Sequence, residues 1–360
     1  MASENGELRL GETELSRRHF LGAAAGTAAA VAIGSWGPSK AFGAGQGERL
    51  IPPGKLGIQL FTVRDAVPRL DNSVVDPMTG ELLRGGFRGV FETLASYGYK
   101  GVEFAGYTQG ANGPITIEEI RALLDEYGLT AMGTHRGLNN FLNPTQREIE
   151  FDIAEILGLE WVGTANAPTN SSTVAAWEQA AENFNIIGEA AAARGLRFYQ
   201  HTHQNEYNFF SDGFPGIRRY DKFLEWTNPE WVASQIDIYW AYVARLQFPN
   251  PVDGSRLDVL AQLQAYPDRY PLYHVKDGVP NSSGTNLTFT DVGDGIIAAG
   301  DPFYAPANFR TLFDEAPRKG WHLYIAERDN APGGSSDPGR SFRTAQRSAE
   351  YMLGLRAGSS

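Results

Sequence analysis

The chain has 360 residues, a net charge of −11 and no cysteine. A chain of this length can form one large domain, and its composition, 42% hydrophobic and 20% charged, is typical of a soluble globular protein. The acidic balance argues against a nucleic-acid binder, because phosphate contacts need a basic surface. Without cysteine, disulfides, thiolate catalysis and cysteine-ligated zinc are excluded.

The N-terminal segment predicts an export signal that lies outside the fold. Arg17 and Arg18 precede an apolar, alanine-rich run at 21–33, and small residues follow at a plausible cleavage site. This order is typical of a signal peptide, and the paired arginines with the following Phe-Leu are similar to a twin-arginine signal. The apolar run is shorter than the ~20 residues that span a bilayer, which disfavours a membrane anchor. We therefore predict a twin-arginine signal peptide and linker at 1–44, export to the periplasm or the extracellular space, and only transient membrane contact.

Strand and helix patterns alternate through the rest of the chain. Short apolar runs predict strands at 56–61, 101–105, 129–134, 161–164, 196–201, 232–238, 272–276 and 321–327. Helical periodicity predicts helices at 87–97, 117–127, 145–157, 173–194, 218–226, 256–265, 308–318 and 341–355. Thr116 and Glu119 form a capping-box pattern at the start of one helix. Glycines such as Gly128 and Gly158 are expected to end helices just before the next strand.

Eight successive strand–helix units predict parallel strands joined by crossover helices, and eight such units close into a (β/α)8 barrel. We therefore assign residues 45–360 to a single-domain α/β TIM barrel. The predicted connections after the strands are often long, as at 64–86 and 277–307, whereas those before the strands are short. Active sites of this fold lie on the loops that follow the strands. An open doubly wound sheet is the alternative, but no glycine-rich fingerprint follows the first strand.

Polar residues stand at the ends of four consecutive predicted strands: His201 and His203, Asp237, His274 and Lys276, and Glu327. Side chains alternate along a strand, so residues two apart, such as His274 and Lys276, face the same way. Such groups at the end of an apolar strand are costly to bury unless they are used or paired. Carboxylates and imidazoles without thiolates suit a divalent ion such as Mn, Mg, Co or Zn. The pattern therefore predicts a metal site at the mouth of the barrel.

The same strand ends resemble those of the sugar phosphate isomerase/epimerase proteins, which have a xylose-isomerase-like barrel. The resemblance covers about 55–355 of this chain. It rests on seven segments taken together and in this order: Leu56–Leu60, Gly98–Glu103, His201–Tyr207, Asp237–Trp240, His274–Gly278, Val292–Gly295 and Ala326–Asp329.

The resemblance implies an enzyme with one divalent metal ion, manganese first, with magnesium, cobalt or zinc as alternatives. The implied ligands are Glu206, Asp237, His274 and Glu327. Many family members carry a glutamate at the end of strand five, where this chain has His201. His201 is therefore the alternative to Glu206 as the fourth ligand. We favour Glu206, because two glutamates and an aspartate hold a hard cation well.

The family also implies the chemistry, which is isomerisation or epimerisation of a sugar through an enediolate that the metal stabilises. The catalytic residues that we expect to carry the proton are Glu327, Glu206, His201 and His203. The residues that we expect to bind the substrate are His135, Lys276, Glu103, Trp240 and Arg328.

The main alternative is a metal-dependent lyase or dehydratase that acts on a keto-sugar or a 3-keto-glycoside and begins with the same enolate. Export favours this alternative, because phosphorylated sugars are scarce outside the cytoplasm. A non-catalytic carbohydrate-binding protein would be expected to have lost the ligand residues. An endonuclease of the same superfamily would need more histidines than the six of this chain and a basic face for DNA. We expect a small carbohydrate as the partner and no nucleic acid, and a homo-oligomer stays open.

Overall fold

The computed structural model describes residues 47–70, 73–110 and 113–358, so the predicted signal peptide lies outside the described part of the chain. Within these ranges, eight parallel strands form one sheet. Their bounds, in chain order, are β1 (Leu56–Gln59), β4 (Gly101–Phe104), β5 (Thr130–Thr134), β6 (Trp161–Thr164), β7 (Arg197–His201), β8 (Val232–Asp237), β9 (Leu272–Val275) and β12 (Leu323–Ala326).

The sheet curls into a nearly closed barrel. Every neighbouring pair of strands is parallel, and the spatial order runs from β5 through β4, β1, β12, β9, β8 and β7 to β6. The two outermost strands approach at His135, just beyond β5, and Gly163 in β6, which form a parallel bridge. There the Arg136 backbone N–H donates to the Gly163 carbonyl oxygen at 2.9 Å. The predicted (β/α)8 barrel is confirmed.

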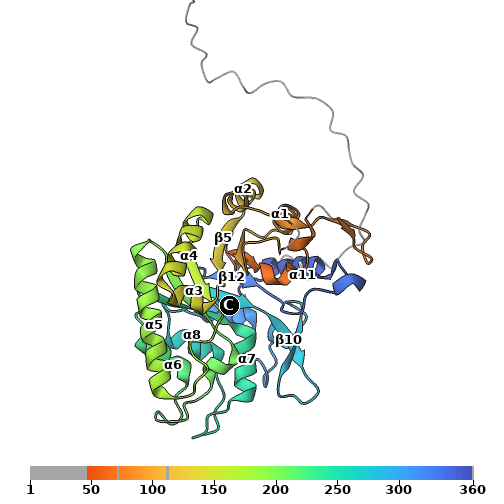
Figure 1. The fold of residues 1–360 in the computed structure, drawn as a ribbon. Helices are drawn as coiled ribbons and strands as arrows, with labels where there is room; N and C mark the ends of the chain where they lie inside the picture. The colour runs from red at the N-terminus through yellow and green to blue at the C-terminus, as the bar shows by residue number, and fades with distance from the viewer. Residues whose placement is uncertain (1–46, 71–72, 111–112, 359–360) are drawn as a thin grey trace, which may run out of the picture. The chain divides into compact units, whose positions relative to one another are not determined.

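Helices lie outside the strands, as Figure 1 shows. The longer ones are α1 (Gly86–Ser96), α2 (Ile117–Tyr127), α4 (Pro144–Leu157), α5 (Val174–Ala193), α6 (Arg219–Trp226), α7 (Ile238–Gln247), α8 (Val259–Ala265), α10 (Phe309–Glu315) and α11 (Arg340–Gly354). The predicted capping box between Thr116 and Glu119 is formed at the start of α2. Gly128 and Gly158 end α2 and α4 in the left-handed conformation, which is the conformation that glycine adopts at little cost.

The structure departs from the predicted elements most clearly after β8. The apolar run that reads as the end of a strand turns at Asp237, whose side chain accepts a hydrogen bond from the Trp240 backbone N–H and caps α7. The helix predicted at 256–265 shortens to α8 for a similar reason, because Asp258 caps it by accepting from the Ala261 backbone N–H. The first strand also stops early. Gln59 accepts from the Phe61 backbone N–H, and a 3-10 turn, η1 (Leu60–Val63), follows.

Two of the long connections contain small antiparallel hairpins that the sequence did not predict. In the connection after β1, β2 (Val74–Val75) pairs with β3 (Leu82–Leu83). In the connection after β9, β10 (Asp277–Pro280) pairs with β11 (Leu287–Thr290). Short helices α3 (Leu138–Leu142) and α9 (Ile296–Ala299), and 3-10 turns η2 (Val67–Arg69), η4 (Gln204–Tyr207) and η5 (Gly334–Ser336), complete the connections. Over the described ranges, no helix combines the length and the apolar character needed to cross a bilayer.

An apolar floor closes the inside of the barrel. Its side chains come from five strands: Trp161, Tyr199, Ala233, Leu272 and Ile325. A larger core fills the space between the strands and the helices. Because side chains on one strand face alternate with a period of two, the next inward positions toward the carboxyl ends are two residues further along. For four of these strands those positions are His201, Gln235, His274 and Glu327. The fold therefore sets a polar layer directly on an apolar floor.

Candidate active site

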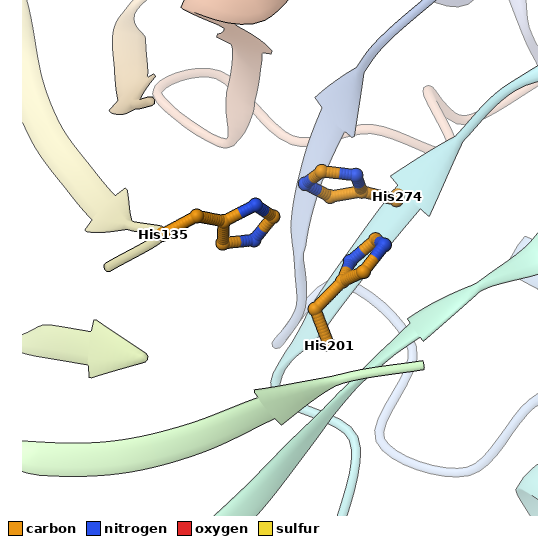
Figure 2. Close-up of side chains that lie close together, drawn as sticks. All are labelled: His135, His201 and His274. Carbon is orange, nitrogen blue, oxygen red and sulfur yellow. The ribbon is translucent and has the colours of Figure 1, made fainter. Parts of the chain in front are cut away.

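Three histidines from different strands meet above the floor. His135 follows β5, His201 ends β7 and His274 lies in β9. Figure 2 shows their imidazole rings turned toward one another. The ring centroids of His201 and His274 are 4.4 Å apart, and that of His135 lies 4.8 Å from His201 and 5.2 Å from His274. One nitrogen of each ring lies within 4.8 Å of the others, which is a spacing that can hold a metal ion.

Glu103 of β4 anchors this layer from below. Its carboxylate is fully buried and accepts hydrogen bonds from Gln59 Nε2 at 2.7 Å, Gln235 Nε2 at 2.6 Å, Tyr199 OH at 2.7 Å and His274 Nε2 at 2.5 Å. Burial alone would raise its pKa, but the neighbouring imidazoles of His135 and His274 lower the pKa of Glu103 to about 2. Glu103 is therefore ionised and fully engaged by protein donors. Its contacts orient the cluster, and the predicted role of Glu103 in substrate binding stays a prediction.

A second group of ligating atoms overlaps the histidines. Asp237, His274 and Glu327 each place one atom within 4.8 Å of the others, and all three side chains are buried. His274 Nδ1 lies 2.9 Å from Glu327 Oε2. The Lys276 ammonium lies 3.1 Å from Asp237 Oδ2, 2.7 Å from Glu327 Oε2 and 2.7 Å from Asp329 Oδ1. Three carboxylates thus surround one lysine at the carboxyl ends of β8, β9 and β12.

The charges in this half of the cluster follow from burial and neighbours. Burial alone would lower the pKa of His274, but the carboxylates of Glu103 and Glu327 raise it to about 10, so the ring is an imidazolium. The carboxylates of Asp237, Glu327 and Asp329 raise the pKa of Lys276 despite its burial. Burial raises the pKa of Asp237 to about 6, although Lys276 opposes the shift. The Glu327 carboxyl, beside two cations, has a lowered pKa despite its burial and stays ionised.

Gln235 fixes the tautomers of the two other histidines. Because its amide nitrogen donates to Glu103, its oxygen is left to accept, and His201 Nδ1 and His135 Nε2 each lie 2.8 Å from it. Burial lowers the pKa of both imidazoles, so each ring is neutral with its proton on the nitrogen that faces Gln235. The unprotonated His201 Nε2 then faces Asp237 Oδ2 at 3.5 Å. Two lone pairs converge there with no proton between them.

The approach of His201 Nε2 to Asp237 Oδ2 bears on whether the residues suit a metal ion. Asp237 Oδ2 is completely buried and accepts no well-aligned hydrogen bond within the described chain. The Lys276 ammonium lies 3.1 Å from this oxygen and offsets part of its charge. A metal cation held by both the oxygen and the unprotonated imidazole nitrogen would satisfy the two facing lone pairs. His274 could become a ligand through Nδ1 if metal binding displaced the Nδ1 proton, while its Nε2–H stays on Glu103, which is the usual arrangement of a ligating histidine and its carboxylate partner. The donor set therefore fits a divalent cation.

Glu206 lies apart from both groups of ligating atoms. It belongs to the turn η4, and its carboxylate accepts from the His203 backbone N–H at 3.1 Å. Burial raises the pKa of Glu206 to about 7. No group of metal-ligating side chains found within the described ranges includes it. Its carboxylate instead lines a neighbouring cavity of about 530 Å³, together with His203, Arg219 and Trp240.

The other residues expected to bind substrate are only partly available. Trp240 stands between the cavity and the cluster, with its ring centroid 6.0 Å from Lys276 Nζ and 5.8 Å from the ring of His203. The Arg328 guanidinium is held by the Asp291 carboxylate at 2.5 Å and donates to Asn330 Oδ1 at 2.8 Å. Arg328 therefore helps to fix the connection after β11, and its role in substrate binding stays a prediction.

Four members of the cluster were not predicted from the sequence: Gln59, Tyr199, Gln235 and Asp329. The signal that could have found two of them is the strand alternation, because Tyr199 and Gln235 stand two residues before His201 and Asp237 and share their face. Asp329 lies two residues after Glu327, beyond the end of β12. Gln59 is the last residue of β1 and is opposite Glu103 in the register with β4.

The fold and this site define a family. Residues 91–343 match the sequence model of the Xylose isomerase-like TIM barrel, and the chain belongs to this family. Residues 14–34 match the signal sequence of the twin-arginine translocation pathway, which supports export by that route.

Particular relatives share parts of this chain. An inosose dehydratase from Histophilus somni (strain 129Pt) is 27% identical over 175 residues, which cover 44% of this chain and 50% of the relative. The chain thus spans about half the length of the curated relatives it matches. A sugar phosphate isomerase/epimerase from Parabacteroides distasonis ATCC 8503 has a TM-score of 0.61 at 21% identity, covering 84% of this chain and 95% of that chain. A D-psicose 3-epimerase from Clostridium cellulolyticum H10 has a TM-score of 0.50 at 13% identity, covering 84% and 100%. The structural likenesses establish the fold.

Proposed function

We propose that the protein is a divalent-metal-dependent sugar isomerase or epimerase that removes and returns a proton at a carbon next to a carbonyl. The observation that carries this proposal is the convergence of His201 Nε2 and Asp237 Oδ2, 3.5 Å apart, beside His274 and Glu327. Enzyme families with the same fold, including isomerases and epimerases, support the reaction class.

We assign the metal to Asp237, His274, Glu327 and His201. His201 replaces Glu206 in this set, because the His201 imidazole faces Asp237 whereas Glu206 lines the neighbouring cavity. Nitrogen and carboxylate oxygen donors without sulfur suit manganese, and also magnesium, cobalt or zinc. When bound, the ion would polarise the substrate carbonyl as a Lewis acid and so acidify the adjacent C–H.

The residues of the chain supply the proton transfer. His203 has a pKa of about 3, because burial and then the Lys276 charge disfavour its protonated form. The ring is therefore neutral and free to accept a proton, but it is a weak base in these surroundings. Glu327 is ionised and can accept one as well. Glu327 directly follows β12 and His203 follows β7, at the two ends of the strand series β12, β9, β8, β7. A substrate held between them would meet one acceptor from each side, as epimerisation requires. Lys276, which stays protonated, can donate a hydrogen bond to a substrate oxygen.

Dehydration of a keto-sugar or 3-keto-glycoside is the second candidate. The observation that favours it is the likeness to inosose dehydratases, at 27–28% identity over part of the chain. This reaction begins with the same proton removal, after which a hydroxyl or glycosyl oxygen leaves from the next carbon. Twin-arginine export favours a substrate without phosphate in either case.

The test is hydrogen exchange in deuterated water with manganese-loaded protein. A panel of unphosphorylated aldoses, ketoses, inososes and 3-keto-glycosides is followed by NMR for loss of one C–H signal, and then by mass spectrometry. Isomerisation gives a product whose mass differs from that of the substrate only by deuterium. Elimination gives a product lighter by one water or, for a 3-keto-glycoside, by the alcohol that leaves. Asp237→Asn serves as the matched inactive variant. Absence of exchange with every sugar would overturn both candidates.

A further inference from the structure

The cavity next to the cluster has unused hydrogen-bonding groups. Besides Glu206 and Arg219, it is lined by Ala167, Asn170 and His203 from connections after strands and by Trp177 and Trp240 from α5 and α7. Within the described chain, no side chain donates a hydrogen bond to the buried Glu206 carboxylate. Trp240 Nε1 and Arg219 Nε are buried and likewise have no partner there. Buried polar groups are normally satisfied, so these point to a ligand.

The lining favours a neutral, hydroxyl-rich ligand over a phosphate. A phosphate site needs concentrated positive charge, but Arg219 stands beside the Glu206 carboxylate. The terminal nitrogens of Arg219 already donate to the backbone oxygens of Asn205 at 2.8 Å and Ser171 at 3.4 Å. Carboxylate, amide and hydroxyl groups next to the Trp240 indole suit a sugar ring, which has an apolar face and polar edges. The volume of about 530 Å³ lies within the ~300–1,000 Å³ of small-molecule sites.

The cavity also adjoins the cluster. The His203 ring lies 4.9 Å from the ring of His201 on one side and lines the cavity on the other. Trp240 likewise lines the cavity and lies 6.0 Å from Lys276 Nζ. A molecule with one ring over the cluster could therefore extend directly into the cavity.

We propose that this cavity is a subsite for a second, uncharged sugar ring, so that the substrate is a glycoside of about disaccharide size. The proposal rests on the proposed function only for the identity of the ring that reacts over the cluster. Binding of the second ring depends on the cavity alone.

The test measures binding, without turnover, by isothermal titration of the manganese-loaded protein. The probes are maltose, cellobiose, trehalose and sucrose, compared with glucose and glucose 6-phosphate. We expect at least one disaccharide to bind roughly tenfold more tightly than glucose, because one or two hydrogen bonds in the cavity add to its affinity. Ala167→Phe, which fills the cavity, should remove this gain and leave glucose binding within about twofold.

Two further variants control this experiment. Ala122→Phe fills a separate cavity of about 580 Å³ and should leave the disaccharide preference intact. Glu206→Gln preserves the shape of the lining and should weaken disaccharide binding by about threefold to tenfold even if Ala167→Phe does not fold. The proposal is overturned if no disaccharide binds better than glucose, if glucose 6-phosphate binds best, or if both cavity variants keep the preference. Loss of exchange activity with retained disaccharide preference would overturn only the proposed function.

Discussion

The polar cluster inside the barrel and the cavity beside it differ in how their buried groups are satisfied. In the cluster, the Glu103 carboxylate accepts four hydrogen bonds from side chains and Lys276 meets three carboxylates. In the cavity, no side chain of the described chain donates to Glu206, and Trp240 Nε1 has no partner. Apart from Asp237 Oδ2, which accepts no well-aligned hydrogen bond within the described chain, the cluster is therefore held in place by the protein itself, whereas we propose that the cavity keeps hydrogen-bonding capacity for a ligand.

This contrast separates two residues that lie close together in the sequence. His201 ends β7 and enters the cluster, and Glu206 lies five residues later in the turn η4 and enters the cavity. The alternation of side chains along β7 points His201 into the cluster, whereas the turn η4 carries Glu206 to the cavity. The two proposed roles therefore divide within one connection, with metal binding proposed for His201 and recognition of a second sugar ring proposed for Glu206.

The largest effect on stability is expected when the central anchor of the cluster is removed. Glu103→Leu leaves the protonated His274 and three other donors buried without their acceptor, which should lower the free energy of unfolding by about 3–5 kcal/mol. The matched change Glu206→Leu should alter it by no more than about 1 kcal/mol, because only backbone donors contact that carboxylate. Urea unfolding of both variants provides the measurement. Equal losses in the two variants would contradict the contrast between the regions.

A kinetic effect is expected at the boundary of the two regions. His203→Gln should slow turnover by roughly 10²–10⁴, the range for loss of a general acid or base, and keep the metal. Turnover and metal content are measured on the same preparation. The control is wild-type protein carried through the same metal loading. Unchanged turnover would remove His203 from the proton transfer and leave Glu327 as the acceptor.

Metal affinity distinguishes the two candidates for the fourth ligand. His201→Gln and Asp237→Asn should each weaken metal binding by at least about 10²-fold, since even indirect partners of a ligand change affinity by about 10–100-fold. Glu206→Gln should retain the metal, because its carboxylate lies in the cavity. Elemental analysis after dialysis against a graded chelator gives the affinities. Metal loss in Glu206→Gln with retention in His201→Gln would restore the ligand set implied by the resemblance.

Most of the difference between the cluster and the cavity could not be predicted from the sequence. The alternation of strand and helix patterns predicted the barrel, and strand parity placed His201, His274 and Glu327 on inward faces. This prediction succeeds because side chains alternate between only two faces of a strand. The position of Glu206 could not be predicted, because the turn η4 follows no repeating period and its carboxylate is held by a backbone N–H.

The predicted elements failed where a side chain capped a helix unexpectedly. Asp237 stands at the end of an apolar run and is followed by Ile238 and Tyr239, which favour a strand by propensity. The capping hydrogen bond to the Trp240 backbone N–H overrides that preference and starts α7. The same carboxylate keeps Oδ2 toward the cluster. Asp237 therefore ends β8, caps α7 and offers a candidate ligand atom. Strand and helix patterns, taken one at a time, do not predict this combination.

The smallest effect is expected in the pH dependence of stability, and it concerns the cavity alone. Burial raises the pKa of Glu206 from 4.5 to about 7, so the folded protein holds this proton over a range in which the unfolded chain has lost it. Below pH 4.5 the carboxyl is neutral in both states. As the pH rises from there toward 7, the unfolded state ionises first, and the stability conferred by the retained proton is lost.

The matched comparison is wild type against Glu206→Gln, which cannot ionise, with both proteins in chelator so that metal binding does not contribute. Between about pH 5 and pH 6 the unfolding free energy of the wild type should fall relative to the variant by about 1 kcal/mol, close to the limit for one proton. Urea unfolding at several pH values gives the difference. A constant difference would mean that Glu206 titrates normally, as an exposed carboxyl does. It would then lie in solvent, and the cavity would lack the buried acceptor that distinguishes it from the cluster.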